Sequence, residues 1–284
     1  DLDIDKPEML MPEDKWILTK LSNTIKNVEQ NMDNFEIGIA VQLVYDFIWN
    51  DICDWYIEMI KPRLYDKENK SYKTAIWTLN YILIAATKML HPFMPFVTEE
   101  VYLNLKSQKE SIMLALWPKA EYEFAEEEKA IDIINDMIRQ IRNARANMNI
   151  TGAKKTSAQI VLEKGKFEEI FKEAEEYFKK LAYIENIEYL DSIDDANTKY
   201  VALHDEKINV FLNMSDAIDL DAEIEKLEKE KQTATSELKR AQGMLKNENF
   251  VNKAPEKLIQ AEKEKVEKYT DLLEKIESRL NELK

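Results

Sequence analysis

The residues best suited to chemistry lie together at positions 49–58, WNDICDWYIE, which hold the only cysteine, three acids and three aromatic side chains. The thiol of Cys53 could act as a nucleophile, and the carboxylates could bind a metal ion or transfer protons. A nucleophilic thiol needs a nearby base, but the only histidines, His91 and His204, are far from it in the sequence and far from each other. They form no familiar zinc spacing either. We therefore assign no catalytic and no metal-binding residue.

On a continuous α-helix this segment has the pattern of a helix at the centre of a bundle. Two adjacent stripes of mostly large apolar side chains cover most of its circumference. They comprise Trp49, Cys53, Tyr56 and Ile60 on one stripe, and Ile48, Ile52, Trp55 and Met59 on the other. Asp51, Asp54 and Glu58 occupy the remaining face, where arginines of a neighbouring helix could bridge them. The pattern predicts a mostly buried helix with one edge free for binding, and it disfavours an enzyme built on this bundle.

The composition favours a helical protein of roughly two domains, since domains average about 150 residues. Only 4 glycines and 7 prolines occur in 284 residues, which leaves little material for hairpin turns or for glycine-rich loops around a nucleotide. One cysteine allows no intramolecular disulfide, and no apolar run reaches the length of about 18 residues that a membrane span needs. We expect a cytoplasmic protein with no membrane partner. The missing initiator methionine suggests a fragment of a longer chain.

Residues 1–150 show helical spacing of their apolar side chains and are predicted to form a helical bundle with short connections. The expected helices are 12–31, 34–61, 71–90, 96–106 and 126–148. Pro12 suits a first helical turn, and Asp33 followed by Glu36 resembles a capping box for the second helix. Pro62, Pro92, Pro95 and Pro118 are expected to end or separate helices.

Residues 151–216 change to a pattern of short strands. Four runs are rich in Ile, Val and Tyr: SAQIVLE at 157–163, IENIEYL at 184–190, KYVAL at 199–203 and KINVFLN at 207–213. A helix-like stretch at 166–182 separates the first run from the second. The region is predicted to be a small α+β module, too small to carry a large site of its own.

Residues 217–284 are predicted to form a long antiparallel coiled-coil hairpin, because spacings of four and three alternate along two equal seams. The first seam is Leu220, Ile224, Leu227, Lys231, Ala234, Leu238, Ala241 and Leu245, and the second is Ile259, Glu262, Val266, Tyr269, Leu273, Ile276, Leu280 and Leu283. The segment 247–255 separates the seams, and Pro255 suits the first turn of the returning helix. If Leu245 lies opposite Ile259, Arg240 comes to lie beside Lys265. A coiled coil that dimerises two chains is the alternative interpretation.

One stretch of this acidic chain contains no carboxylate. The net charge of −15 argues against a general nucleic-acid binder and gives no reason to expect DNA as a partner. Between Asp136 and Glu163, however, five cations occur without an acid: Arg139, Arg142, Arg145, Lys154 and Lys155. The arginines recur every third residue, so on a helix they share one broad face that could follow a phosphate backbone. The alternative is a solvated or salt-bridged face.

Five stretches carry a resemblance to a known family. They are WNDICDWYIEMIKP at 49–62, LHPFMPFVTEEVY at 90–102, SIMLALWP at 111–118, IRQIRNARANMNI at 138–150 and NENFVNKAPEKLIQAEKEKVEKY at 247–269. The first four resemble the anticodon-binding helical bundle of class I aminoacyl-tRNA synthetases. The last resembles the tip and returning helix of the C-terminal arm in the valyl-tRNA synthetase family. The resemblance covers nearly the whole chain.

The resemblance implies a parent enzyme that attaches valine to its tRNA using ATP and Mg²⁺. The chain has no HIGH-type or KMSKS-type sequence, so it resembles the tRNA-handling portion alone, without a cofactor and as a monomer. Its implied partner is a valine-accepting tRNA. Ile57 matches an aliphatic position that can lie against an anticodon base, and Arg240 and Lys265 match basic positions of the arm, expected at the tRNA elbow. Arg139, Arg142, Arg145, Lys154 and Lys155 are candidates for contacts with the tRNA backbone.

Two alternatives remain open from the sequence. The chain could be an interaction or scaffold protein whose coiled coil mediates association. It could also be the same region of another class I synthetase, which only the partner tRNA would distinguish.

Overall fold

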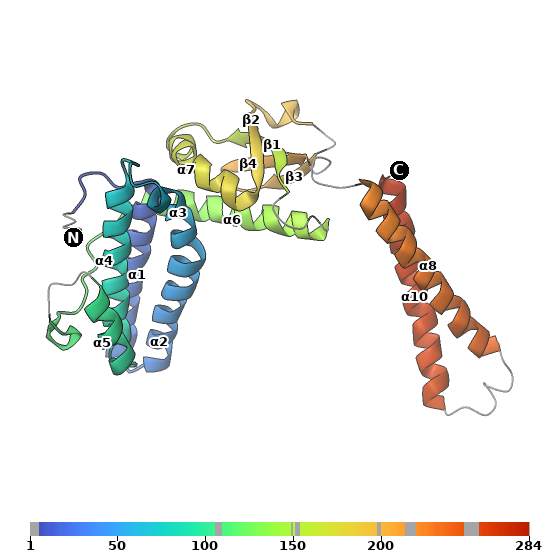
Figure 1. Ribbon diagram of the computed structural model, residues 1–284, viewed down its shortest axis with the longest axis horizontal. Coiled ribbons are helices and arrows are strands. Elements are labelled where there is room, and N and C mark those ends of the chain that lie inside the picture. The colour runs from blue at the N-terminus through green and yellow to red at the C-terminus, as the bar shows by residue number, and fades with distance from the viewer. Residues whose placement is uncertain are drawn as a thin grey trace. The chain divides into compact units, whose positions relative to one another are not determined.

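The computed structural model describes residues 6–105, 110–148, 150, 154–197, 200–213, 220–246 and 256–283. They form two compact units, Asp1–Met214 and Ser215–Lys284, which are described separately (Figure 1). The protein is mainly helical, with one four-stranded sheet in the first unit. The regions 1–150 and 151–216 both contribute to this first unit, and their division into two domains stays a prediction.

The helical part of the first unit contains six α-helices, one π-helix and one 3-10 turn among its described residues. They are α1 (Pro12–Asp33), α2 (Ile37–Asp46), the π-helix η1 (Phe47–Tyr56), α3 (Ile57–Tyr65), α4 (Tyr72–Leu90), α5 (Pro95–Asn104), the 3-10 turn η2 (Ile112–Leu114) and α6 (Ala125–Asn147). α1 packs against α2, α4 and α6, and Trp16, Leu21, Ile25 and Val28 of α1 are buried at a helical spacing. The predicted bundle is confirmed.

The connection between α1 and α2 differs from the prediction. Pro12 lies in the first turn of α1, as predicted, but α1 continues to Asp33. Glu36 is the residue before α2, so Asp33 and Glu36 do not form the capping box of that helix. Phe35 turns the chain between them with a positive φ of 60°. The capping prediction was wrong because a residue inside one helix cannot also cap the next.

The predicted helix 34–61 is interrupted by the π-helix η1. Its hydrogen bonds span five residues, so each turn holds more residues than an α-turn and the side-chain stripes shift around the axis. Tyr56 and Ile60 are buried as predicted, whereas Trp49 and Cys53 of the same expected stripe are exposed. Pro62 does not end the helix either, because α3 continues to Tyr65.

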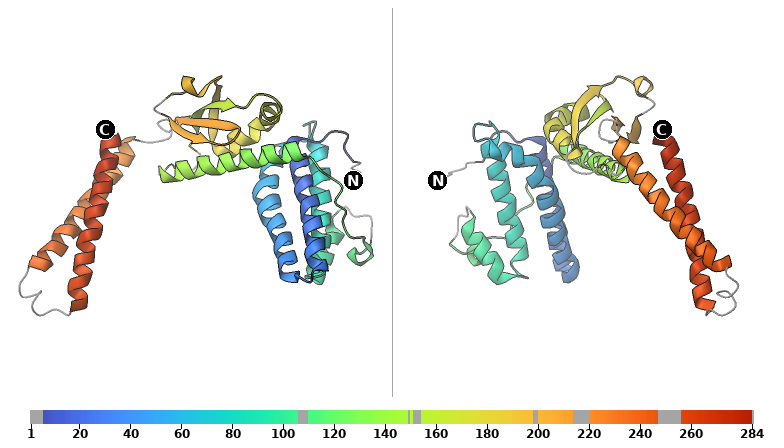
Figure 2. Two further views of the ribbon diagram at one scale, coloured as in Figure 1. Left: turned by 180° about the vertical axis from the view of Figure 1, so that it is seen from behind. Right: turned by 45° about the vertical axis from the view of Figure 1, so that its right-hand side comes forward.

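The α+β part of the first unit follows the predicted order. Its elements are β1 (Thr156–Leu162), α7 (Lys166–Ala182), β2 (Ile184–Tyr189), the 3-10 turn η3 (Ile193–Asp195), β3 (Val201–His204) and β4 (Ile208–Asn213). The strand order is β2-β1-β4-β3, with β1 and β2 parallel and the other pairs antiparallel. α7 is the crossover that a parallel pair requires, and it also packs against α6 (Figure 2). The sheet is therefore tied to the bundle through α6 and α7.

The second unit consists of α8 (Leu220–Lys246) and α10 (Glu256–Leu283), which pack against each other and run in opposite directions (Figure 1). Ala234, Ala241, Ile276 and Leu280 of the predicted seams are buried. The remaining seam residues whose side chains are described are half-buried. The segment 247–255, with Pro255, lies outside the described residues, and the coiled-coil geometry itself stays a prediction.

Candidate nucleic-acid interface

Two of the predicted arginines of α6 lie over one buried tryptophan. The guanidinium carbon of Arg139 lies 4.9 Å from the ring centroid of Trp55, and that of Arg142 lies 5.7 Å from it. A guanidinium at these distances is attracted by the negative face of the indole ring. Both arginines remain exposed, while Trp55 is buried beneath them. The structure therefore brings the WNDICDWYIE segment and the arginine row together.

The partner of these arginines differs from the one expected. The sequence suggested that they bridge Asp51, Asp54 and Glu58, but the contact that the structure shows is made through Trp55. Arg139 also forms an ion pair with Asp136 on its own helix. Glu58 is held by Lys61. The charge of the arginine row is thus used partly for cation–π contacts inside the unit.

Further hydrogen bonds join the end of α6 to the α+β part. Arg142 Nε donates to the carbonyl oxygen of Leu181 at 2.9 Å. Arg145 is only 3% exposed, donates through Nη2 to the carbonyl oxygen of Lys154 at 2.5 Å and lies over the Tyr183 ring at 5.2 Å. Burial lowers the pKa of Arg145. Because Arg145 is buried, only Arg139 and Arg142 of the row present their side chains to a ligand.

The two predicted lysines follow this arginine row. Lys154 and Lys155 are exposed immediately before β1. Lys155 lies 3.8 Å from Glu185, a distance that leaves its ammonium group largely solvated. Together with Arg139 and Arg142 they supply the exposed positive charge of this region.

Ile57 begins α3, directly after the buried pair Trp55 and Tyr56. Its side chain is half-buried, whereas Cys53 and Asp54 in the preceding turn are exposed. An aliphatic side chain in this position offers an apolar contact at the surface while its base is supported by the bundle. The structure leaves its predicted contact with an anticodon base untested.

In the second unit, Arg240 of α8 and Lys265 of α10 point into solvent, with side chains 70% and 49% exposed. Arg240 lies 3.7 Å from Glu237, and Lys265 lies 2.6 Å from Glu262, each on its own helix. Exposed pairs of this kind contribute little to stability. Their expected position beside each other stays a prediction.

A buried ionic network fixes the helix that carries Trp55 and Ile57. Arg63 donates from both terminal nitrogens to Asp14, at 3.0 and 2.9 Å, and to Glu13 at 2.6 Å. The Tyr56 hydroxyl donates to Asp14 at 2.7 Å. Burial, together with the neighbouring Asp14 carboxylate, raises the pKa of Glu13 to about 7. The sequence analysis missed this network, because no local pattern joins Arg63 to acids about 50 residues earlier in the chain.

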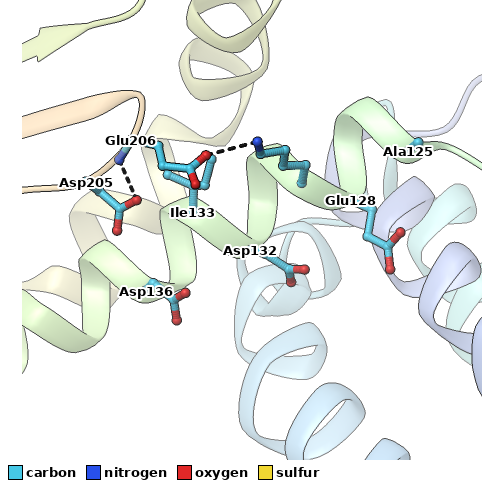
Figure 3. Close-up of a pocket in the computed structure, with 8 residues that line it drawn as sticks. Ala125, Glu128, Asp132, Ile133, Asp136, Asp205 and Glu206 are labelled. Atoms are coloured by element: carbon cyan, nitrogen blue, oxygen red, sulfur yellow. Dashed lines mark hydrogen bonds and ion pairs between the residues drawn. The ribbon is translucent and has the colours of Figure 1, made fainter.

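A surface cavity beside α6 is unsuited to RNA. It encloses about 310 Å³ beside α6 and the turn between β3 and β4 (Figure 3). Five carboxylates line it: Glu128, Asp132, Asp136, Asp205 and Glu206. One of them, Glu206, pairs with Lys129 at 2.9 Å. The excess of negative charge would repel a phosphate backbone.

The described part of the chain contains neither a membrane-spanning helix nor a cluster of metal ligands. None of the described helices is long and apolar enough to cross a membrane. Within the same described residues, no group of three or more His, Cys, Asp or Glu side chains could hold a metal ion.

Family models match both units of the chain. Residues 14–162 match the family described as the anticodon-binding domain of tRNA ligase. Residues 219–284 match the family described as the valyl tRNA synthetase tRNA binding arm. The chain therefore belongs to the anticodon-binding domain family of tRNA ligases, and its C-terminal unit belongs to the valyl arm family. The resemblance found in the sequence is confirmed.

Similar proteins with the name valine–tRNA ligase occur in several bacteria. The one from Clostridium acetobutylicum is 39% identical over 273 residues, which are 95% of this chain and 31% of the relative. Those from Staphylococcus carnosus and Thermotoga maritima are each 36% identical, over 99% and 97% of this chain and 32% and 31% of the relatives. This chain thus spans about a third of the length of these relatives.

Proposed function

We propose that this chain is the tRNA-binding portion of a valine–tRNA ligase. The observation that carries the proposal is the presence of both family matches, in this order, on one chain. An anticodon-binding domain occurs in several tRNA ligases, whereas the arm model is specific to the valyl enzyme. The alternative of another class I synthetase is therefore disfavoured.

The two units have different tasks in this proposal. The bundle reads splayed anticodon bases, with Ile57 as an apolar contact and Arg139, Arg142, Lys154 and Lys155 as contacts with phosphates. α8 and α10 form an antiparallel coiled coil, and Arg240 and Lys265 on its flank contact the tRNA elbow. Recognition of unstacked bases and recognition of RNA shape are the two modes by which proteins distinguish RNAs.

The whole enzyme would join valine to its tRNA with ATP and Mg²⁺. Those reactants would bind in the remaining two thirds of a chain as long as the relatives, and the residues described above would supply only tRNA binding. We propose a cytoplasmic protein that acts as a monomer on a valine-accepting tRNA.

A fluorescence-anisotropy titration tests the proposal. The 284-residue chain is titrated with valine tRNA and with the same transcript carrying a changed anticodon, at two salt concentrations. We expect tighter binding to the unchanged transcript and weaker binding of both at higher salt, because phosphate contacts release counterions. Absence of binding even at low salt, together with a dimer in light scattering, would contradict the proposal and favour a scaffold protein.

A further inference from the structure

α5 is a helix whose solvent side is almost as apolar as its buried side. Thr98 and Tyr102 point into the bundle. On the outside lie four exposed apolar side chains, of which Phe96 is 89% exposed; the others are Val97, Val101 and Leu103. The helix also carries Glu99 and Glu100, but its exposed apolar side chains outnumber these two charges.

The chain after α5 enlarges this apolar surface. Glu99 of α5 accepts hydrogen bonds from the Ser111 hydroxyl at 3.1 Å and from the backbone N–H of Ile112 at 3.2 Å, which holds η2 against α5. The exposed side chains Met113, Leu114 and Leu116 follow, the last 79% exposed. We call the seven residues Phe96, Val97, Val101, Leu103, Met113, Leu114 and Leu116 the α5 face.

Leaving such a surface in water is costly. Burial of apolar area contributes about 25 cal/mol per Å², and contiguous exposed apolar patches on soluble proteins commonly mark sites of contact with other protein surfaces. Scattered single apolar residues would need no explanation, but six residues of the α5 face lie on two packed elements, and Leu116 follows two residues after η2.

We propose that the α5 face is the docking surface for the rest of the polypeptide in a chain as long as the relatives. The relatives have about two thirds of their length outside the region matched here, which is ample protein to cover the face. The inference goes beyond tRNA binding, because it assigns a surface to an interface within the protein.

The charges around the face argue for protein and against RNA as the occupant. α5 has no lysine or arginine, and Glu99, Glu100 and Glu110 are the charged residues of 95–104 and 110–116; the sequence between these ranges adds Lys106 and Lys109, so acids still outnumber cations over 95–116. RNA binding requires cations for the phosphates and aromatic or planar groups for the bases. The aliphatic side chains that dominate here instead match the interior of a protein interface.

Hydrogen–deuterium exchange tests the proposal. Exchange at residues 95–104 is compared between this 284-residue chain and the longest chain encoded by the reading frame that contains it, without tRNA and with valine tRNA. We expect exchange to be slower by about tenfold or more in the longer chain, because a docked surface must open before these amides exchange. The double variant Phe96→Ser, Leu116→Ser should abolish this protection in the longer chain and leave tRNA binding by the 284-residue chain unchanged. Tyr65→Ser, at an equally exposed residue outside the α5 face, is the matched control.

Each other outcome overturns the proposal. Equal exchange in both chains, or a reading frame confined to these 284 residues, would leave the face without the proposed occupant. Protection that appears only on addition of tRNA would assign the face to RNA. A concentration-dependent dimer of the 284-residue chain that the double variant dissociates would assign it to a second copy. None of these results would affect the tRNA titration that tests the proposed function.

Discussion

The two cationic regions of the chain differ in what holds their charges. On α6, Arg139 and Arg142 lie over Trp55, and Arg145 is buried against Lys154 and Tyr183. In the second unit, Arg240 and Lys265 extend into solvent and pair, among the described residues, with acids on their own helices. The cations of α6 therefore serve packing inside the first unit, whereas those of the second unit are held by ion pairs at the surface. We expect the bundle to recognise anticodon bases with side chains that are held in fixed positions. We expect the arm to bind the tRNA mainly through charge.

The largest expected effect is a loss of stability on removal of the buried ionic network around Arg63. Arg63→Ala leaves Asp14 and Glu13 buried without their cation, which should lower the free energy of unfolding by about 3–5 kcal/mol. Thermal unfolding followed by circular dichroism measures the change. Lys61→Ala, which removes a surface ion pair on the same helix, is the control and should change the stability little. Equal losses in both variants would show that the network does not fix the bundle.

The pH dependence of stability should reveal the titration of Glu13 in the same network. Its pKa is raised from 4.5 to about 7 in the folded protein, so the folded state keeps a proton that the unfolded state has lost. Stability from this group is therefore complete below about pH 4.5 and is lost as the pH rises to about 7, by up to about 3 kcal/mol. Glu13→Gln should flatten this slope in urea unfolding measured across that pH range. If stability depends on pH equally in Glu13→Gln and in the original protein, other groups cause the dependence.

Charge reversal in the arm should affect binding without affecting the fold. Arg240→Glu with Lys265→Glu should weaken tRNA binding on the order of tenfold, regardless of the anticodon, and reduce the salt slope by about 2, because two phosphate contacts are lost. Lys229→Glu with Lys275→Glu, on the same two helices, is the matched control. Unchanged affinity and slope would remove the arm from the recognition model.

The smallest expected effect is at Ile57. Ile57→Ala should reduce the preference for the valine anticodon by a few-fold, about 1 kcal/mol, because it removes an apolar contact with a base. Anisotropy with both transcripts and a thermal melt measure discrimination and stability together. An equal loss of affinity for both transcripts with a lower melting temperature would mean that Ile57 serves only as core.

Much of the fold was predictable because it depends on local periodicity. The strands and the helix of the α+β part lie within one or two residues of their predicted positions, and the described seam residues of α8 and α10 are buried or half-buried. The helical spacing of residues 126–148 likewise predicted α6 to within one residue at each end. For the candidate site, the sequence singled out the cations between Asp136 and Glu163 and the aromatic segment 49–58.

What the sequence by itself determined was the order and type of the elements, since hydrophobic spacing and prolines act within a few residues. Only the tertiary structure decided that η1 is a π-helix that exposes Trp49, that Trp55 and not the acids receives the arginines, and that Arg145 is buried. It also joined Arg63 to Asp14 across 49 positions of the chain. These outcomes depend on which distant side chains share a desolvated space, where an unpaired charge is costly, and no local pattern encodes that proximity.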